Sequence, residues 1–255
     1  SEIYFLMQGQ IWGAEISRTK KGWQLAEPYP VTDIPGGISE FKMSPDQSAL
    51  MYISHVKSAV KSPTDCYSDL DKANAYTTDD LMYRHWDHTV LEIPHTFIAD
   101  FDFSGSEITP DNSVDLLAGE AELYELPTEP FGGVEQLAWS PDGKHIAYSC
   151  RKKTGIEYAF STNTSIYVMN IETGETVAVK TDGGYDTDPA WSEDGKHLAW
   201  ISMPRDGYEA DQQRLFVCDV DFSAEQPYSN IRNLSASFDN DVAGIVWHGD
   251  EIYFN

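Results

Sequence analysis

One short pattern recurs four times along the chain, and it constrains the fold more than any other feature. Residues 137–148 read Leu-Ala-Trp-Ser-Pro-Asp-Gly-Lys-His-Ile-Ala-Tyr, and residues 189–200 read Pro-Ala-Trp-Ser-Glu-Asp-Gly-Lys-His-Leu-Ala-Trp. Weaker copies occupy residues 41–52 and 245–254. A repeat with a period of roughly 50 residues indicates a fold built from identical modules stacked on one another.

Each copy predicts a β-hairpin. An apolar strand runs into Ser-Pro-Asp-Gly, in which proline presets the turn and glycine takes the left-handed position at its end. An alternating strand follows, such as 144–149, and two more strand-like runs come after it, at 165–171 and 176–180. Four antiparallel strands in such a module are typical of a β-propeller blade, and no segment shows a sustained helical period. The predicted fold class is all-β with little helix.

The repeats place the whole chain in a single propeller fragment of about three full blades and two partial ones. Because the chain begins and stops inside blades, we expect a piece of a longer protein, although pairing of the two ends into a small closed ring is an alternative. The expected ranges are a partial blade at 1–35, full blades at about 36–118, 132–182 and 184–235, and a partial blade at 242–255.

Composition limits the partners. Among 255 residues, 42 Asp and Glu stand against 17 Lys and Arg, which gives a formal charge of −25. Nucleic acid and anionic membrane surfaces are disfavoured as partners because both attract basic patches. No apolar run approaches the roughly 20 residues of a membrane span, and no signal peptide is recognisable. Hydrophobic residues, at 41%, are too frequent for a disordered chain.

The longest segments between predicted strands are 57–94, 151–164 and 203–212. All three join the second strand of a blade to the third, and in antiparallel blades such connections leave from the same face. Long insertions on one face of a rigid scaffold are a usual place for recognition, although each could also be a tolerated surface loop. We expect a binding surface on this face.

Two of these insertions place a glutamate beside an aromatic residue. Carboxylates next to aromatic rings suit a ligand ammonium, through charge-assisted hydrogen bonds and cation–π contact. The alternative is that they are exposed loop acids, or partners of Arg151 and Arg205. The candidate substrate-binding residues are Glu157, Tyr158, Arg205, Tyr208, Glu209 and Asp211.

Residues 84–88 read Arg-His-Trp-Asp-His, and His95 follows. Such a cluster can bind a divalent metal, but the spacing on an extended chain fixes no third ligand. The alternative is an arginine–aspartate pair and a packed tryptophan that anchor the insertion. We therefore predict no metal and no other cofactor. The aspartates of the repeated turn, Asp142 and Asp194, are expected to bond to their own turns.

No catalytic residue is predicted in the chain. The sequence has no Gly-x-Ser-x-Gly nucleophile elbow and no phosphate-binding glycine loop. The three cysteines form neither a Cys-x-x-Cys motif nor a disulfide framework, so they leave the redox compartment open.

The repeats at 139–148 and 191–200 resemble WD40-like repeats of the TolB type. The motifs Leu-Met-Tyr-Arg-His-Trp-Asp (81–87), Pro-Phe-Gly-Gly (130–133) and the run at 203–216 are more specific. They resemble the N-terminal propeller of prolyl-oligopeptidase-family serine peptidases, in the dipeptidyl-peptidase and acylaminoacyl-peptidase branch. In that family a seven- or eight-bladed propeller precedes an α/β-hydrolase domain that holds the catalytic Ser, Asp and His.

The resemblance implies that the propeller restricts access to oligopeptides and that its acidic residues hold the substrate's free N-terminus. Its implied partners are an α/β-hydrolase domain in the parent chain and an oligopeptide substrate. The chain departs from the family because it has no hydrolase domain and too few blades. Glu157 and Glu209 do not reproduce the paired-glutamate segment of the best-known dipeptidyl peptidases. The family occurs on both sides of the inner membrane, with a periplasmic or extracytoplasmic site slightly favoured here.

The leading hypothesis is the non-catalytic propeller portion of a serine oligopeptidase that gates access and helps to bind the substrate N-terminus. The alternative is a stand-alone TolB-like propeller that serves as a protein-binding scaffold. A third hypothesis is a propeller lyase that uses the histidine cluster and a metal.

Overall fold

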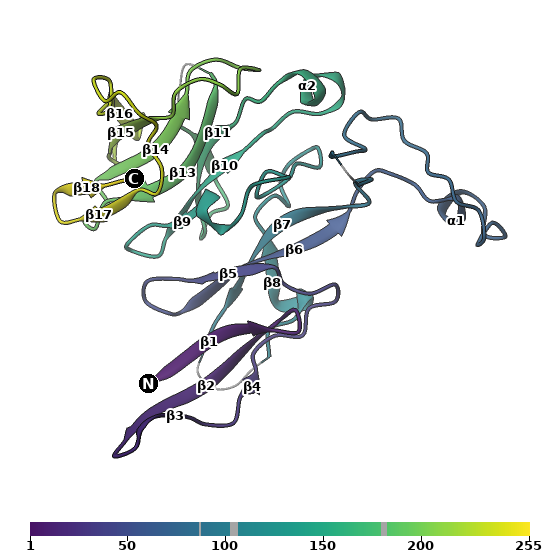
Figure 1. Cartoon of the computed structure of the whole chain (residues 1–255), viewed down its shortest axis with the longest axis horizontal. Helices are drawn as coiled ribbons and strands as arrows, with labels where there is room; N and C mark the ends of the chain where they lie inside the picture. The colour runs from purple at the N-terminus through teal and green to yellow at the C-terminus, as the bar shows by residue number, and fades with distance from the viewer. Residues whose placement is uncertain (87, 103–106, 180–182) are drawn as a thin grey trace.

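The computed structural model describes residues 1–86, 88–102, 107–179 and 183–255. The strands form five antiparallel sheets in chain order (Figure 1). The first contains β1 (Glu2–Met7), β2 (Gln10–Thr19), β3 (Gly22–Leu25) and β4 (Tyr29–Pro30). The second contains β5 (Glu40–Met43), β6 (Ala49–Lys57), β7 (Glu92–Asp100) and β8 (Ser113–Asp115).

The third sheet contains β9 (Leu137–Trp139), β10 (His145–Cys150), β11 (Ser165–Asn170) and β12 (Thr176–Ala178). The fourth contains β13 (Tyr185–Trp191), β14 (His197–Met203), β15 (Arg214–Val220) and β16 (Tyr228–Asn233), and the last contains β17 (Val246–His248) and β18 (Glu251–Tyr253). In the first sheet, β3 and β4 both pair with β2, so they share one position beside it. The predicted all-β class, with three complete four-stranded blades and two partial ones, is confirmed.

The repeated sequence pattern has a hydrogen-bonding explanation. In the third sheet, Asp142 accepts hydrogen bonds from the Ser140 hydroxyl and the Lys144 amide, at 2.5 and 3.1 Å. The Ser140 hydroxyl also accepts the His145 amide at 2.9 Å. Asp194 forms the same contacts in the fourth sheet. The prediction that these aspartates bond to their own turns is confirmed.

The recurring tryptophan ties the fourth sheet to the third and the fifth sheet to the fourth. The Trp191 indole donates to the Ala138 carbonyl at 3.2 Å, and the Trp247 indole donates to the Ala190 carbonyl at 3.0 Å. Each bond joins the first strand of one sheet to the first strand of the preceding sheet. The spacing of the repeat in sequence therefore sets the stacking of the sheets in space.

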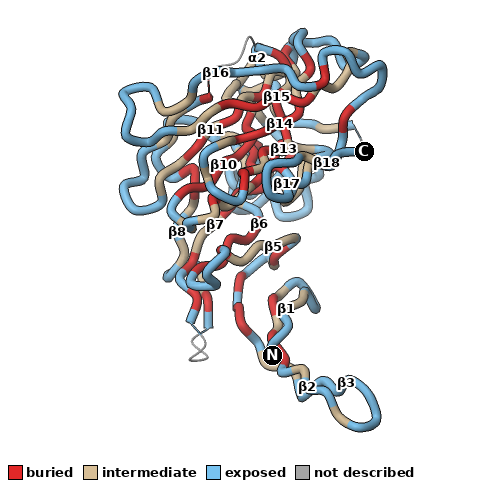
Figure 2. Tube along the Cα trace, turned by 90° about the vertical axis from the view of Figure 1, so that its left-hand side faces the viewer, coloured by how far each residue is buried: buried red, intermediate tan, exposed pale blue. Residues whose placement is uncertain are grey.

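Apolar side chains fill the space between successive sheets. One cluster lies between each neighbouring pair, so the core consists of four layers in series. Trp200 is fully buried between the third and fourth sheets, and its indole donates to Asp186 at 3.1 Å. Burial is concentrated in the strands, whereas the tip of the β2–β3 hairpin is exposed (Figure 2).

The insertions leave the sheets on one side, as expected, and they contact one another. Two short helices occur in them: α1 (Pro63–Cys66) in the first and α2 (Gly155–Phe160) in the second. The Gly155 amide donates to Asp80 of the first insertion at 3.2 Å, and Ser161 donates to Asp206 of the third at 2.6 Å. Over the described ranges, no helix is long and apolar enough to cross a membrane.

The series of cores predicts how stability responds to substitution. Leu198 is fully buried between the third and fourth sheets, so Leu198→Ala should lower the free energy of unfolding by about 2–5 kcal/mol. Leu25→Ala, at a side chain that is 51% exposed, should change it by about 0.5 kcal/mol or less. Urea unfolding followed by tryptophan fluorescence measures both. Equal effects of the two substitutions would contradict the stacked core.

Candidate functional site

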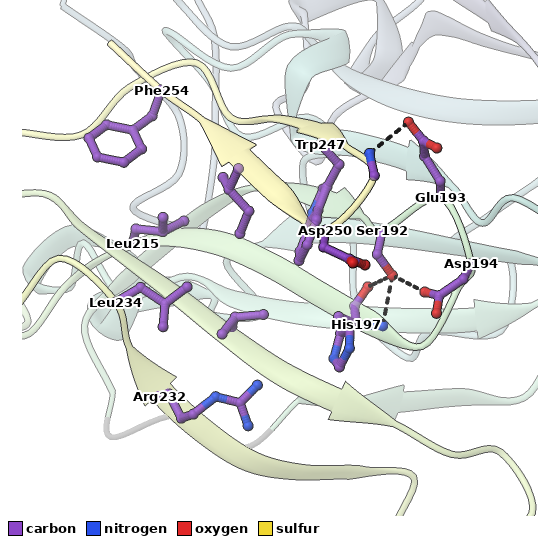
Figure 3. A pocket seen from close by; sticks show the side chains of 13 residues that line it. Ser192, Glu193, Asp194, His197, Leu215, Arg232, Leu234, Trp247, Asp250 and Phe254 are labelled. Atoms are coloured by element: carbon purple, nitrogen blue, oxygen red, sulfur yellow. Dashed lines mark hydrogen bonds between the residues drawn. The ribbon is translucent and has the colours of Figure 1, made fainter.

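A cavity of about 510 Å³ between β15–β16 and β17–β18 contains a serine, an aspartate and a histidine (Figure 3). The Ser192 hydroxyl bonds to Asp194 and to the main chain of His197, not to its ring. The His197 ring lies 3.2 Å from Asp219 instead. Because Ser140 and Asp142 form the same turn, this group belongs to the repeat and is not a catalytic triad.

A second cavity, of about 380 Å³, lies where the three insertions meet. It is called the insertion pocket below. The linker between the second and third sheets supplies the rest of its wall, together with Tyr185 of β13. Its lining residues are His85, Trp86, Thr128, Glu129, Pro130, Phe131, Arg151, Tyr158, Thr162, Tyr185, Met203 and Glu209.

A buried carboxylate holds the insertion pocket together. Glu125 is 3% exposed and accepts hydrogen bonds from the His85 ring at 2.7 Å, the Tyr158 hydroxyl at 2.8 Å and the Glu129 amide at 3.2 Å. These partners come from the first insertion, the second insertion and the linker. A buried charge is tolerated only when it is paired and hydrogen-bonded, so the three contacts depend on one another.

The pKa values of the two side chains that donate to Glu125 reflect this contact. The hydrogen bond that the His85 ring donates to Glu125 raises the pKa of His85, although burial and the charge of Arg151 oppose it. Burial, and then the nearby Glu125 charge, raise the pKa of Tyr158 far above its usual value. Tyr158 therefore stays protonated and remains a hydrogen-bond donor, while His85 favours its cationic form.

Arg151 fixes the second insertion against the linker. Its guanidinium lies over the Tyr158 ring, 4.4 Å from the centroid, where the cation meets the face of the aromatic system. It also donates to the Ser161 carbonyl at 3.2 Å and to the Glu129 carbonyl at 3.4 Å. Arg151 thereby joins the backbones on either side of the insertion pocket.

Asp206 docks the third insertion on the second. Its carboxylate accepts the Ser161 hydroxyl and the amides of Thr162 and Asn163, at 2.6, 2.8 and 3.1 Å. The Gly207 amide returns a hydrogen bond to the Thr162 hydroxyl at 2.9 Å. Partial burial alone would raise the pKa of Asp206, but these hydrogen bonds lower it. The contacts fix the loop that carries Glu209.

The structure separates the six predicted substrate-binding residues into three groups. Tyr158 and Glu209 line the insertion pocket, whereas Glu157 is exposed on α2 and is not among the lining residues. Arg205, Tyr208 and Asp211 contact one another. This agrees with the alternative that the acidic residues of the insertions are partners of a nearby arginine. The Arg205 guanidinium lies 3.8 Å from the Tyr208 ring centroid, and its Nε donates to both oxygens of Asp211 at 2.8 and 2.9 Å.

Two carboxylates remain available in the insertion pocket. Within the described residues, the side chains of Glu129 and Glu209 have neither a hydrogen-bond partner nor an ion-pair partner. The basic Arg151 beside them is held by carbonyl groups and by Tyr158. The insertion pocket therefore combines unpaired acid groups with aromatic rings, which is a composition that suits a cationic ligand.

The histidine cluster is divided between two carboxylates. His85 pairs with Glu125, while His95, in the second sheet, pairs with Asp115 at 2.6 Å. Asp87 lies outside the described residues. Among the described residues, including this cluster, no three His, Cys, Asp or Glu side chains lie close enough together to hold a metal ion. The alternative of a packed Trp86 is wrong, because Trp86 is 78% exposed. The half-buried His85, which is bonded to Glu125, anchors the insertion instead.

Glu125 and Glu129 were not predicted from the sequence. Both lie in the linker between expected blades, where an acidic residue in a highly acidic chain stands out by neither spacing nor composition. The side chains that donate to Glu125 lie 40 residues earlier and 33 residues later in the chain. The one available signal was the motif Pro-Phe-Gly-Gly at 130–133, which marks the same linker.

The role of Glu125 can be tested by titration. Glu125→Gln should lower the pKa of His85, because it removes the hydrogen bond and the charge that raise this pKa most, while burial and Arg151, which lower it, remain and only Glu129 still opposes them. In the chain without this substitution, the raised pKa of His85 stabilises the folded state. This stabilisation is complete below pH 6.5 and is lost as the pH rises through the pKa of His85 in the folded state. NMR titration of the His85 ring measures the shift. The exposed Glu122→Gln serves as a matched control, and a raised pKa that survives in Glu125→Gln would refute the contact.

Comparisons with known proteins were made for the whole chain. No protein-family model matches it. Dipeptidyl-peptidase 5 of Porphyromonas gingivalis is 43% identical over 223 residues, which cover 86% of this chain and 31% of that protein. The chain thus spans about a third of the length of this curated relative.

Solved structures show the same fold. An uncomplexed acylaminoacyl peptidase of Pyrococcus horikoshii matches 99% of this chain and 33% of its own, with a TM-score of 0.60 and 15% identity. TolB from Acinetobacter baumannii matches 99% of this chain and 46% of its own, with a TM-score of 0.50 and 14% identity. The sequence relative and the shared fold confirm the resemblance drawn from the motifs: this chain is similar in sequence to about a third of dipeptidyl-peptidase 5, and it shares the β-propeller fold of acylaminoacyl peptidase and TolB.

Proposed function

We propose that the chain is the non-catalytic propeller portion of a serine oligopeptidase and that the insertion pocket binds the free N-terminus of the substrate. One observation carries the proposal: Glu129 and Glu209, from the linker and the third insertion, offer unpaired carboxylates to the same cavity. The relative's name, dipeptidyl-peptidase 5, supports it, because an enzyme that removes dipeptides must locate the amine end of its substrate.

The chemistry of an ammonium group matches this cavity. A peptide ammonium donates three hydrogen bonds and carries one positive charge, so it gains most from carboxylates that have no competing partner. By contrast, Arg205 already neutralises Asp211 at the loop surface, which leaves little for a ligand to gain there.

Access control follows from the position of the insertion pocket. The three insertions and the linker lie on one side of the stacked sheets, so a long or folded polypeptide would meet them before it reached the cavity. We assign the catalytic serine, aspartate and histidine to an α/β-hydrolase domain of the parent protein, which faces this side and is the partner of the propeller. The oligopeptide is held between the two.

Removing one carboxylate tests the amine site. Glu209→Gln should weaken binding of a free-amine tripeptide to the 255-residue chain by about tenfold or more, since one charged hydrogen bond contributes about 1.5–3 kcal/mol. Isothermal titration calorimetry, or NMR for weak binding, measures the dissociation constant. Binding of the same tripeptide with an acetylated N-terminus should be weak in both proteins.

Glu157→Gln is the matched control, because Glu157 is an exposed glutamate in a neighbouring insertion that does not line the insertion pocket. It should change the dissociation constant by about twofold or less. The proposal fails if acetylation has no effect on binding, or if Glu157→Gln weakens binding as much as Glu209→Gln does.

Catalysis is expected to require the partner domain. The 255-residue chain should not hydrolyse dipeptidyl or acylaminoacyl chromogenic substrates, because no residue in the insertion pocket is an activated nucleophile. A continuous absorbance assay measures this. Turnover that is abolished by a serine-directed inhibitor would falsify the assignment of the chain as non-catalytic.

A further inference from the structure

Two large aromatic side chains stand exposed at the edge of the insertion pocket. Trp86 is 78% exposed and Phe131 is 72% exposed, and their rings meet edge to face with centroids 4.9 Å apart. They come from the first insertion and from the linker, 45 residues apart in sequence. Large apolar side chains of this size are normally buried, and exposed groups of them mark binding surfaces.

Hydrogen bonds hold a neighbouring residue of each member of this aromatic pair. Trp86 follows His85, whose ring is tied to the buried Glu125. Phe131 lies in a turn closed by a hydrogen bond from the Gly132 amide to the Thr128 carbonyl at 2.8 Å. A Cβ atom on Gly132 would come within 2.3 Å of that carbonyl oxygen, so the turn has little room to change. The two rings are therefore exposed but pre-organised, which lowers the entropic cost of binding a ligand.

The aromatic pair lines the same cavity as the two unpaired carboxylates. In a peptide's first residue the ammonium and the side chain are attached to one Cα atom. A site that binds both must therefore present an anionic part and an apolar part next to each other. A volume of about 380 Å³ lies within the roughly 300–1,000 Å³ that is typical of small-ligand pockets.

We propose that Trp86 and Phe131 form a subsite for the side chain of the substrate's first residue. This proposal rests on the amine site proposed above. The favoured substrates are oligopeptides that begin with an aromatic or large aliphatic residue. The occupant is the side chain of the peptide whose ammonium is held by Glu129 and Glu209. The charge of the carboxylates selects the amine end of a peptide. The aromatic pair then distinguishes peptides by the apolar area of the first residue's side chain.

A peptide series on the 255-residue chain tests the subsite. Three tripeptides that differ only in their first residue, Phe, Leu or Gly, are titrated against the chain, each with a free and with an acetylated N-terminus. We expect the Phe and Leu peptides to bind about tenfold or more tightly than the Gly peptide, as is usual for one apolar side chain in a matching pocket. Trp86→Ala and Phe131→Ala should remove that preference and change binding of the Gly peptide by about twofold or less.

Two further variants test whether a loss of affinity comes from misfolding, or from removing any exposed aromatic side chain, and not from the subsite. Trp23→Ala removes a tryptophan that is 66% exposed in β3 of the first sheet, and it should leave all affinities unchanged. Phe131→Leu keeps an apolar side chain, and it should retain most of the preference that Phe131→Ala loses. Circular dichroism of each variant reports whether the sheets are intact.

The outcomes separate the subsite from the amine site. Equal affinity for the Phe and Gly peptides overturns the subsite, and so does a Trp86→Ala effect of the same size on both peptides. The second result would show that the ring contacts the ammonium or the backbone, or that a protein domain covers it instead. If acetylation still abolishes binding in either case, the amine site stands and the subsite alone fails. If acetylated and free peptides bind equally, or none binds, both proposals fail.

Discussion

The insertion pocket depends on one buried carboxylate. Glu125 is reached from three segments that are far apart in sequence, through His85, Tyr158 and the Glu129 amide. Without these donors its charge would be buried and unpaired, at a cost of several kcal/mol. Glu125 thereby ties the first and second insertions to the linker, and Asp206 ties the third insertion to the second. A change at Glu125 should therefore disturb more than one wall of the insertion pocket.

The sheets provide a rigid base for this arrangement. Turn aspartates hold the hairpins of the third and fourth sheets, and tryptophan indoles hold the fourth sheet to the third and the fifth to the fourth. Both devices lie in strands and turns that are away from the insertions. The repeated part of the sequence therefore encodes stacking, and the non-repeated part encodes recognition. The same division explains why Ser192, Asp194 and His197 resemble a triad but belong to the scaffold.

The fold could be predicted from the sequence because its signals are local and repeated. Turn chemistry and strand alternation located the four-stranded sheets, and antiparallel connectivity placed the insertions on one side. The site was only partly predictable. Glu209 and Tyr158 were expected beside a ligand, but Glu125 acquires its role through partners in distant segments, and Glu129 acquires its role only from its place in the wall of the insertion pocket. Trp86 was expected to be packed, and no sequence pattern distinguishes a buried tryptophan from one exposed at a pocket edge.

The central claim is that a peptide's amine end binds where the three insertions meet. A crystal structure of the 255-residue chain soaked with a free-amine dipeptide tests it most directly. The account predicts density in the insertion pocket, with the ammonium within hydrogen-bonding distance of Glu209 or Glu129. Density instead in the cavity between β15–β16 and β17–β18, or an insertion pocket that remains empty at saturating dipeptide, would contradict it.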